Sequence, residues 1–238
     1  MTMLTDVSVP RIVSRDEWLA ARTQLLAEEK QWTRATDALA ARRRALPMVE
    51  LAKPYTFTGP QGTISLGDLL DGRQQLITYH YMSRPEPDEG CPSCSFAVDN
   101  LGNLTHLHAC DTTLALISRA PWPSIQRFRQ RMGWPLPWYS SADSDFNDDF
   151  GASTPDTDPT RDVAGLSVFL RDGQRIFHTY STYQRGIEAV LGTLHCLDLT
   201  PRGRQRHLRD FPYHDQYPHA TQTGSPPVCC QHEGCPCR

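Results

Sequence analysis

The residues with the clearest capacity for chemistry are the two cysteines of the segment Cys91-Pro92-Ser93-Cys94. Thiols at positions i and i+3 share one face of the first turn of a helix, close enough to form a disulfide and to open it again. The thiolate is the attacking species, and a helix N-terminus stabilises it, which lowers the thiol pKa below its usual value of about 8.5. Pro92 suits the first helical position because its φ angle is already helical and it has no N–H to leave unpaired. We therefore expect Cys91 to be an exposed nucleophile and Cys94 to resolve the mixed disulfide.

A Cys-x-x-Cys segment is also half of a common zinc site, and a second such pair at the usual interval would favour a metal. Cys110 and Cys196 each stand alone, so neither supplies that pair. The dithiol follows a predicted buried strand and begins a predicted helix, a context that favours redox chemistry over structural zinc.

The end of the sequence carries a second group of soft ligands. Thiolates and imidazole bind Zn²⁺ or Cu(I), although the spacing here matches no standard zinc module. The segment could have either of two functions. It could acquire a metal ion, or it could be a mobile second dithiol that passes electrons to Cys91 and Cys94 by thiol exchange. An unstructured end without a set role is the third interpretation. The residues concerned are Cys229, Cys230, His232, Cys235 and Cys237.

Two further side chains are candidates for supporting roles at the carboxyl ends of the predicted parallel strands, the edge at which ligands meet an open α/β sheet. His80 could accept the proton of the resolving thiol, since histidine titrates near neutrality, or could be a hydrogen-bonded structural residue. Arg119 could stabilise a thiolate or hold a substrate carboxylate. The alternative for Arg119 is a surface ion pair with Asp143 or Asp145.

Charge and composition exclude several classes of function. Lysine and arginine number 24 against 27 acidic residues, and the net charge of -3 provides no attraction to nucleic acid or to an anionic membrane. No signal-like segment and no membrane-spanning run is found, so we expect a cytoplasmic protein, in which the 8 cysteines are not a disulfide framework. Without glycine-rich nucleotide motifs, we expect that no organic cofactor is required and that an external thiol donates electrons.

Three regions are predicted to position these residues. Residues 1–47 form a helical arm with a capping-box start at Ser14 and an end before Pro47, which lies against the domain or pairs with a second copy as a homodimer. Residues 48–200 form the main domain. Residues 201–238 lack periodicity and are expected to be an extended tail that carries the cysteine and histidine cluster.

Strands and helices alternate in the main domain, which predicts a parallel βαβα unit with right-handed crossovers. A hairpin around Asp172-Gly173, a dipeptide favoured in tight turns, adds antiparallel strands. The predicted fold class is α/β: a mixed, thioredoxin-like central sheet with a C-terminal antiparallel hairpin, flanked by helices and preceded by a long N-terminal helix. The expected elements are strands at 74–82, 112–118, 166–170 and 175–180 and helices at 92–107, 122–132 and 186–194, with a polar loop at 141–162.

A series of short motifs lies along this domain, including Gly90-Cys91-Pro92-Ser93-Cys94-Ser95-Phe96, Asp111-Thr112-Thr113, Ser118-Arg119-Ala120-Pro121, Asp149-Phe150-Gly151, His178-Thr179-Tyr180 and Leu197-Asp198-Leu199-Thr200-Pro201. In this order they resemble the bacterial family called domain of unknown function 899. That family is regarded as thioredoxin-like and as predicted dithiol-disulfide oxidoreductases, and the resemblance implies both for this chain. The chain departs from the family pattern at Cys110, where a basic residue is expected, and in the cysteine-rich tail after Tyr217. It also has Ala164-Gly165 where thioredoxins place a cis-proline.

The sequence therefore predicts a thiol-disulfide oxidoreductase that acts on a protein or small-molecule disulfide. One alternative is a metal-binding or redox-sensing accessory protein that uses the dithiol and the cysteine-rich tail. The other is a peroxiredoxin-like thiol peroxidase, which resembles this chain in strand order. Such peroxidases place threonine or serine three residues before the reactive cysteine, where this chain has Asp88.

Overall fold

The computed structural model describes residues 9–82, 89–154 and 158–218. The predicted ligands Cys229, Cys230, His232, Cys235 and Cys237 lie outside the described residues, as does Asp88. Among the described residues, no helix combines the length and apolar character that a bilayer crossing requires.

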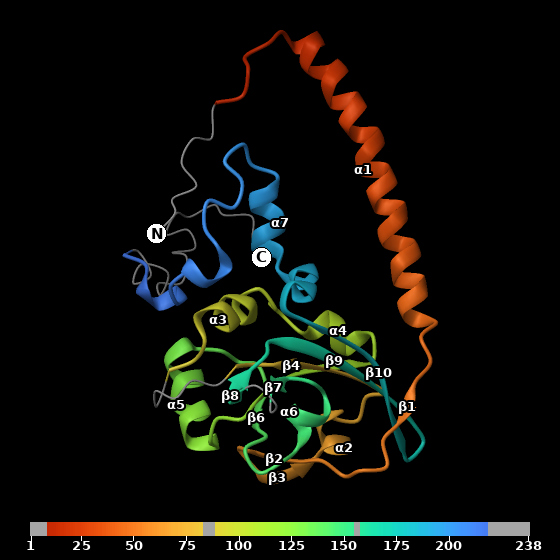
Figure 1. The fold of residues 1–238 in the computed structure, drawn as a ribbon, viewed down its shortest axis with the longest axis vertical. Coiled ribbons are helices and arrows are strands. Elements are labelled where there is room, and N and C mark those ends of the chain that lie inside the picture. The colour runs from red at the N-terminus through yellow and green to blue at the C-terminus, as the bar shows by residue number, and fades with distance from the viewer. Residues whose placement is uncertain (1–8, 83–88, 155–157, 219–238) are drawn as a thin grey trace, which may run out of the picture.

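The centre of the molecule is a mixed sheet of 8 strands in the order β1-β10-β9-β4-β5-β6-β2-β3 (Figure 1). β4 is parallel to β5, while β9 is antiparallel to both β4 and β10. This strand arrangement, β10-β9-β4-β5, is that of a thioredoxin-like domain, and the remaining strands extend it at both edges. The bounds are β1 Val49–Glu50, β2 Thr56–Gly59, β3 Gly62–Ser65, β4 Gln75–His80, β5 Thr112–Ser118, β6 Trp138–Ser140, β9 Gly165–Asp172 and β10 Arg175–Tyr183.

Helices cover both faces of this sheet, and each face has its own hydrophobic cluster. β5 is buried along its whole length, as expected of a parallel strand covered on both sides. Side chains alternate across β4, so Tyr79 faces one cluster and Leu76 the other. The first face carries α3 (Pro92–Asp99), α5 (Trp122–Met132), η1 (Gln184–Val190) and α7 (Gly192–Asp198), and the second carries α2 (Leu66–Leu69) and α6 (Phe146–Asp149).

The predicted helix over 92–107 is divided in two in the structure. α3 ends at Asp99, and α4 (Thr105–Ala109) begins after a turn in which Gly102 has a φ of 60°. The Asn103 side chain accepts a hydrogen bond from the Thr105 N–H at 2.8 Å, which starts the second helix. Glycine tolerates this left-handed conformation, and the change of direction lets α4 pack on β5.

The predicted loop at 141–162 contains a small two-stranded sheet in addition to α6. Its strands are β7 (Ser153–Thr154) and β8 (Asp158–Asp162). Neither has the apolar alternation by which strands are recognised in a sequence.

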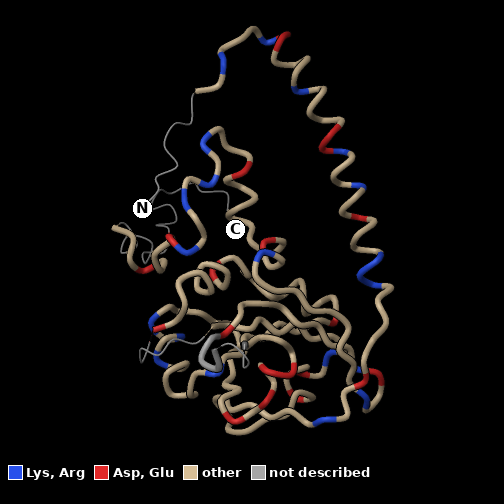
Figure 2. The backbone as a smooth tube through the Cα atoms, in the orientation of Figure 1, with Lys and Arg blue, Asp and Glu red and all other residues tan. Residues whose placement is uncertain are grey.

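The N-terminal arm is a single helix, α1 (Arg15–Arg44), with no buried residue. The Ser14 side chain accepts a hydrogen bond from the Glu17 N–H at 3.2 Å, which caps the first turn as predicted. Figures 1 and 2 show that α1 extends away from the sheet, with its basic residues at the end that joins the domain. There the Arg43 guanidinium lies 5.5 Å from the centre of the Tyr180 ring on β10.

The C-terminal segment, residues 200–218, contains no α-helix or strand, and it is anchored to the domain through Leu208, Phe211 and Tyr213. It contains two short turns, η2 (Leu208–Asp210) and η3 (His214–Gln216). The Phe211 ring lies 4.6 Å from the Phe96 ring on α3, and Tyr213 is only 5% exposed. Single aromatic anchors hold this segment, which explains why it shows no helical or strand periodicity.

Candidate dithiol site

The dithiol lies where the chain returns from β4 into α3. Cys91 is the N-cap residue of α3 and Pro92 occupies the first turn, as predicted. The Ser95 N–H donates to the Cys91 carbonyl at 2.9 Å, which closes that turn. Cys91 and Cys94 carry thiols, and the two side chains are hydrogen bonded to each other. The helix thus brings both sulfurs together beside its N-terminal amides.

Both cysteines are buried, so the prediction of an exposed Cys91 is wrong. Cys91 is 9% exposed and Cys94 is fully covered, and both belong to the cluster on the α3 face of the sheet. The C-terminal segment explains part of this cover: the Tyr213 hydroxyl donates to the carbonyl of Gly90, next to Cys91. The Tyr213 ring also packs 5.6 Å from the ring of Phe128 on α5.

The surroundings of Cys94 favour its protonated form. Burial, followed by the hydrogen bond and charge of Cys91, raises the pKa of Cys94 well above its usual value. The Tyr79 hydroxyl and the Met82 backbone N–H act in the opposite direction, because both stabilise a thiolate at this position. Tyr79 makes no hydrogen bond of regular geometry in the described part of the chain, so its hydroxyl is available to Cys94.

A second set of hydrogen bonds fixes Cys91 through its backbone. The Tyr81 hydroxyl lies 2.7 Å from Ser95 Oγ and 3.3 Å from the Cys91 carbonyl, and Ser95 Oγ donates to that carbonyl at 3.0 Å. Gly90 permits this approach, because a Cβ there would lie 2.0 Å from the Tyr81 oxygen. The sequence analysis did not predict a role for Tyr79 and Tyr81. Their i, i+2 spacing in the predicted strand 74–82, which leads to the dithiol, places both side chains on one face and could have indicated it.

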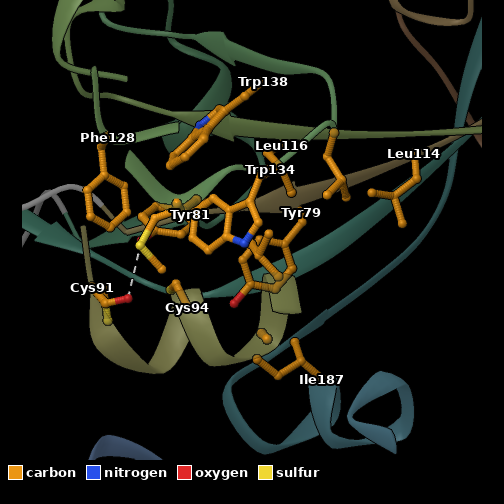
Figure 3. Packing of buried hydrophobic residues seen from close by; sticks show 14 of the residues in the cluster. Tyr79, Tyr81, Cys91, Cys94, Leu114, Leu116, Phe128, Trp134, Trp138 and Ile187 are labelled. Atoms are coloured by element: carbon orange, nitrogen blue, oxygen red, sulfur yellow. Dashed lines mark hydrogen bonds between the residues drawn. The ribbon is translucent and has the colours of Figure 1, made fainter. Parts of the chain in front are cut away.

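Aromatic rings form the wall behind the dithiol (Figure 3). The Tyr81 ring lies 4.5 Å from Trp138 and 6.4 Å from Trp134, and Phe128 lies 5.7 Å from Trp134. Trp134 satisfies its indole N–H by donating to Asp99 at the end of α3, at 2.7 Å. These contacts tie α3 and α5 to the sheet and exclude water from the region around Cys94.

The structure does not bring His80 to the dithiol. Its side chain lies on the opposite face of β4 from Tyr79, where it stacks on Phe146 at 5.5 Å. His80 Nε2 lies 2.8 Å from Ser167 Oγ, and Ser167 in turn lies 2.8 Å from Ser181 Oγ. Burial, with a smaller effect of His178, lowers the pKa of His80 to about 3. His80 is therefore a neutral residue of the second cluster.

Arg119 is paired, but with a carboxylate other than those predicted. Its guanidinium contacts Asp162 at 2.6 Å, rather than Asp143 or Asp145. Asp162 has a 2% exposed side chain and lines the cavity described next. Arg119 thus neutralises a buried carboxylate near the dithiol.

A cavity of about 810 Å³ lies beside the dithiol. Its wall includes Ser93, between the two cysteines, and Tyr79 and Met82, which contact Cys94. Residues of η1 and of the C-terminal segment also line it. The described residues contain no group of three or more His, Cys, Asp or Glu side chains placed to hold a metal ion, and Cys110 and Cys196 are exposed.

The fold and this site define a thioredoxin-like α/β domain with a dithiol at the strand-to-helix junction. The model of the family described as "Bacterial protein of unknown function (DUF899)" matches residues 7–217, and the chain belongs to this family. No curated protein matches the chain.

Among solved structures, the chain is similar to several peroxiredoxins. The bacterioferritin comigratory protein of Xanthomonas campestris shares 16% identity, with a TM-score of 0.45 over 63% of this chain and 98% of that chain. Peroxidoxin BcpB from Mycobacterium tuberculosis shares 15% identity, with a TM-score of 0.46 over 64% of this chain and 97% of that chain. The reduced 2-Cys peroxiredoxin of Plasmodium vivax shares 12% identity, with a TM-score of 0.40 over 63% of this chain and 94% of that chain.

Proposed function

We propose that this protein is a thiol-disulfide oxidoreductase in which Cys91 attacks and Cys94 resolves. The observation that carries the proposal is the pair of hydrogen-bonded thiols at the first turn of α3, with the N-cap position held by Cys91. The helix N-terminus stabilises negative charge on Cys91, and the hydrogen bond from the Cys94 thiol adds to this.

The reaction transfers two electrons to the substrate. The Cys91 thiolate attacks one sulfur of a disulfide R–S–S–R, the S–S bond breaks, and the leaving thiolate takes up a proton to become RSH. Cys94 then loses its proton and attacks Cys91 Sγ, which releases the second RSH. The protein ends with a Cys91–Cys94 disulfide, which an external thiol returns to the dithiol form.

The high pKa of Cys94 suits the resolving role. Cys94 remains protonated while Cys91 waits for substrate, so only one thiolate is present and the two sulfurs do not repel each other. When Cys94 is deprotonated, the Tyr79 hydroxyl and the Met82 N–H stabilise the charge. The aromatic wall limits access of water during this step.

Trapping tests these roles. In Cys94→Ser the resolving step is lost. After reaction with bis(2-hydroxyethyl) disulfide we therefore expect one 2-mercaptoethanol leaving as free thiol and the other held in a stable mixed disulfide with Cys91, seen by mass spectrometry of the Cys91 peptide. Cys91→Ser is expected to abolish reduction of the same compound. Both variants also carry serine at the four tail cysteines and at the exposed Cys110 and Cys196, so that no other accessible thiol can take the place of Cys91. Retained activity of Cys91→Ser in that background would refute the assignment.

A further inference from the structure

The cavity beside the dithiol has a marked charge asymmetry. Four arginines and two carboxylates line it, and the carboxylates are neutralised within the fold. Asp162 pairs with Arg119, and Glu188 lies 2.8 Å from Arg185. Glu188 also contacts Arg204 at 2.9 Å. The negative charges of the cavity are therefore satisfied by neighbouring cations.

Two cations at the cavity remain without such a partner. Arg206 and Arg209 line the cavity from the C-terminal segment, and both are exposed. Neither forms an ion pair with any residue in the described ranges. The cavity thus presents two arginine side chains whose charge is not compensated.

Several side chains of the cavity wall are apolar and come from elements next to the dithiol. Tyr79 and Met82, which contact Cys94, line the cavity together with Ser93, and so do Ile187 of η1 and Leu194 of α7. An aliphatic disulfide matches these apolar side chains in polarity. The volume is within the range of about 300 to 1,000 Å³ that holds small ligands in proteins.

We propose that this cavity binds a small organic disulfide that carries carboxylate groups, with the carboxylates at Arg206 and Arg209 and the S–S bond at the dithiol. The assignment rests on the proposed function and names its substrate class. Arginine binds a carboxylate through two parallel N–H donors, which gives orientation as well as attraction. Each turnover consumes one disulfide and two dithiol electrons and releases two carboxylate-bearing thiols, with no further reactant.

Three disulfides of similar length and different charge test the proposal: 3,3′-dithiodipropionate, which is a dianion, neutral bis(2-hydroxyethyl) disulfide and dicationic cystamine. Each is mixed with the pre-reduced full chain in which the four tail cysteines are serine, and single-turnover rates are compared. We expect the dianion to react fastest and cystamine slowest. The ratio of dianion to neutral rates is expected to fall by about two- to tenfold in Arg206→Gln/Arg209→Gln.

A matched control removes two exposed arginines outside the cavity, in Arg42→Gln/Arg202→Gln, and is expected to keep the wild-type ratio. The preference for the dianion is also expected to weaken at 0.5 M NaCl, because salt screens exposed charges. Two outcomes would overturn the substrate assignment: equal rates for the three compounds, or a ratio of dianion to neutral rates that Arg206→Gln/Arg209→Gln leaves unchanged. Either outcome would leave the proposed thiol-disulfide oxidoreductase activity in place. Failure to reduce any of the three would overturn the proposed function as well.

Discussion

Tyr213 packs in the same cluster as Cys91 and is hydrogen bonded to the residue that precedes it. Its hydroxyl donates to the Gly90 carbonyl. Substrate must reach the Cys91 sulfur, which is 9% exposed. We therefore expect the position of the Tyr213 side chain to govern how often Cys91 is open to attack.

Removal of the Tyr213 ring is expected to raise the reactivity of Cys91. In Tyr213→Ala, N-ethylmaleimide should alkylate Cys91 severalfold faster than in the wild type, followed by mass spectrometry of the Cys91 peptide. Tyr213→Phe, which loses only the hydrogen bond to Gly90, should give a smaller increase. Tyr217→Ala, at a 41% exposed position of the same segment, serves as the control. Unchanged alkylation in Tyr213→Ala would show that another group covers Cys91.

His80 makes the folded state sensitive to acid. Its pKa is about 3 in the folded protein and about 6.5 when unfolded, so below pH 6.5 the unfolded state takes up a proton that the folded state does not. Above pH 6.5 His80 is neutral in both states, so it does not reduce the unfolding free energy. As the pH falls from 6.5 toward 3, protonation of His80 in the unfolded state alone lowers the unfolding free energy. From pH 7 to pH 4.5 this loss amounts to about 2 to 3 kcal/mol.

A variant without an imidazole should lose less stability in acid. We expect the decrease in unfolding free energy between pH 7 and pH 4.5, measured with urea, to be smaller by that amount in His80→Gln. Glutamine keeps a polar group near Ser167 Oγ, the partner of His80. If the unfolding free energy decreases equally in wild type and variant, groups other than His80 cause the acid sensitivity.

At the scale of elements, α1 exposes large apolar side chains at heptad spacing. Trp18, Leu25, Trp32 and Leu39 lie on one stripe of the helix, with exposures from 45% to 67%. A repeat of this kind is the seam of a coiled coil, since it presents an apolar side chain on the same face at every second turn. A helix of this length with no buried face gains little stability from its own domain.

We propose that α1 pairs with α1 of a second copy in an antiparallel coiled coil. The acidic first turn, with Asp16 and Glu17, then meets the basic last turn, Arg42 to Arg44, and Trp18 of one copy lies opposite Leu39 of the other. Light scattering is expected to show a dimer that Leu25→Glu/Trp32→Glu converts to a monomer. Ala20→Glu/Ala27→Glu, each two residues after a seam residue and so facing away from the seam, should remain dimeric. A monomeric wild type at micromolar concentration would contradict this pairing.

At the scale of the whole molecule, periodic features could be predicted from the sequence and isolated contacts could not. Apolar runs located β4 and β5, and the capping residue Ser14 located the start of α1. The dithiol could be placed at the start of α3 because its surroundings obey local rules for helix N-termini. The packing of Tyr213 in the same cluster as Cys91 joins residues far apart in the chain, and such a contact leaves no local pattern.

The sequence also did not determine which face of the sheet each side chain of β4 occupies. His80 and Tyr79 are adjacent in β4, and only one of them can face the dithiol. Sequence reasoning chose His80 for its chemistry, whereas the sheet places Tyr79 beside Cys94 and His80 beside Phe146. Knowledge of which face α3 covers would have settled the choice.

The attachment of the C-terminal segment has a consequence for the thiols beyond residue 218. Tyr213 holds the chain beside Gly90, and 15 residues separate it from Cys229 in the sequence. A flexible connection of this length would give an effective concentration on the order of millimolar. We therefore expect any electron exchange between the tail and the dithiol of one chain to be a unimolecular event, with a rate independent of how much protein is present.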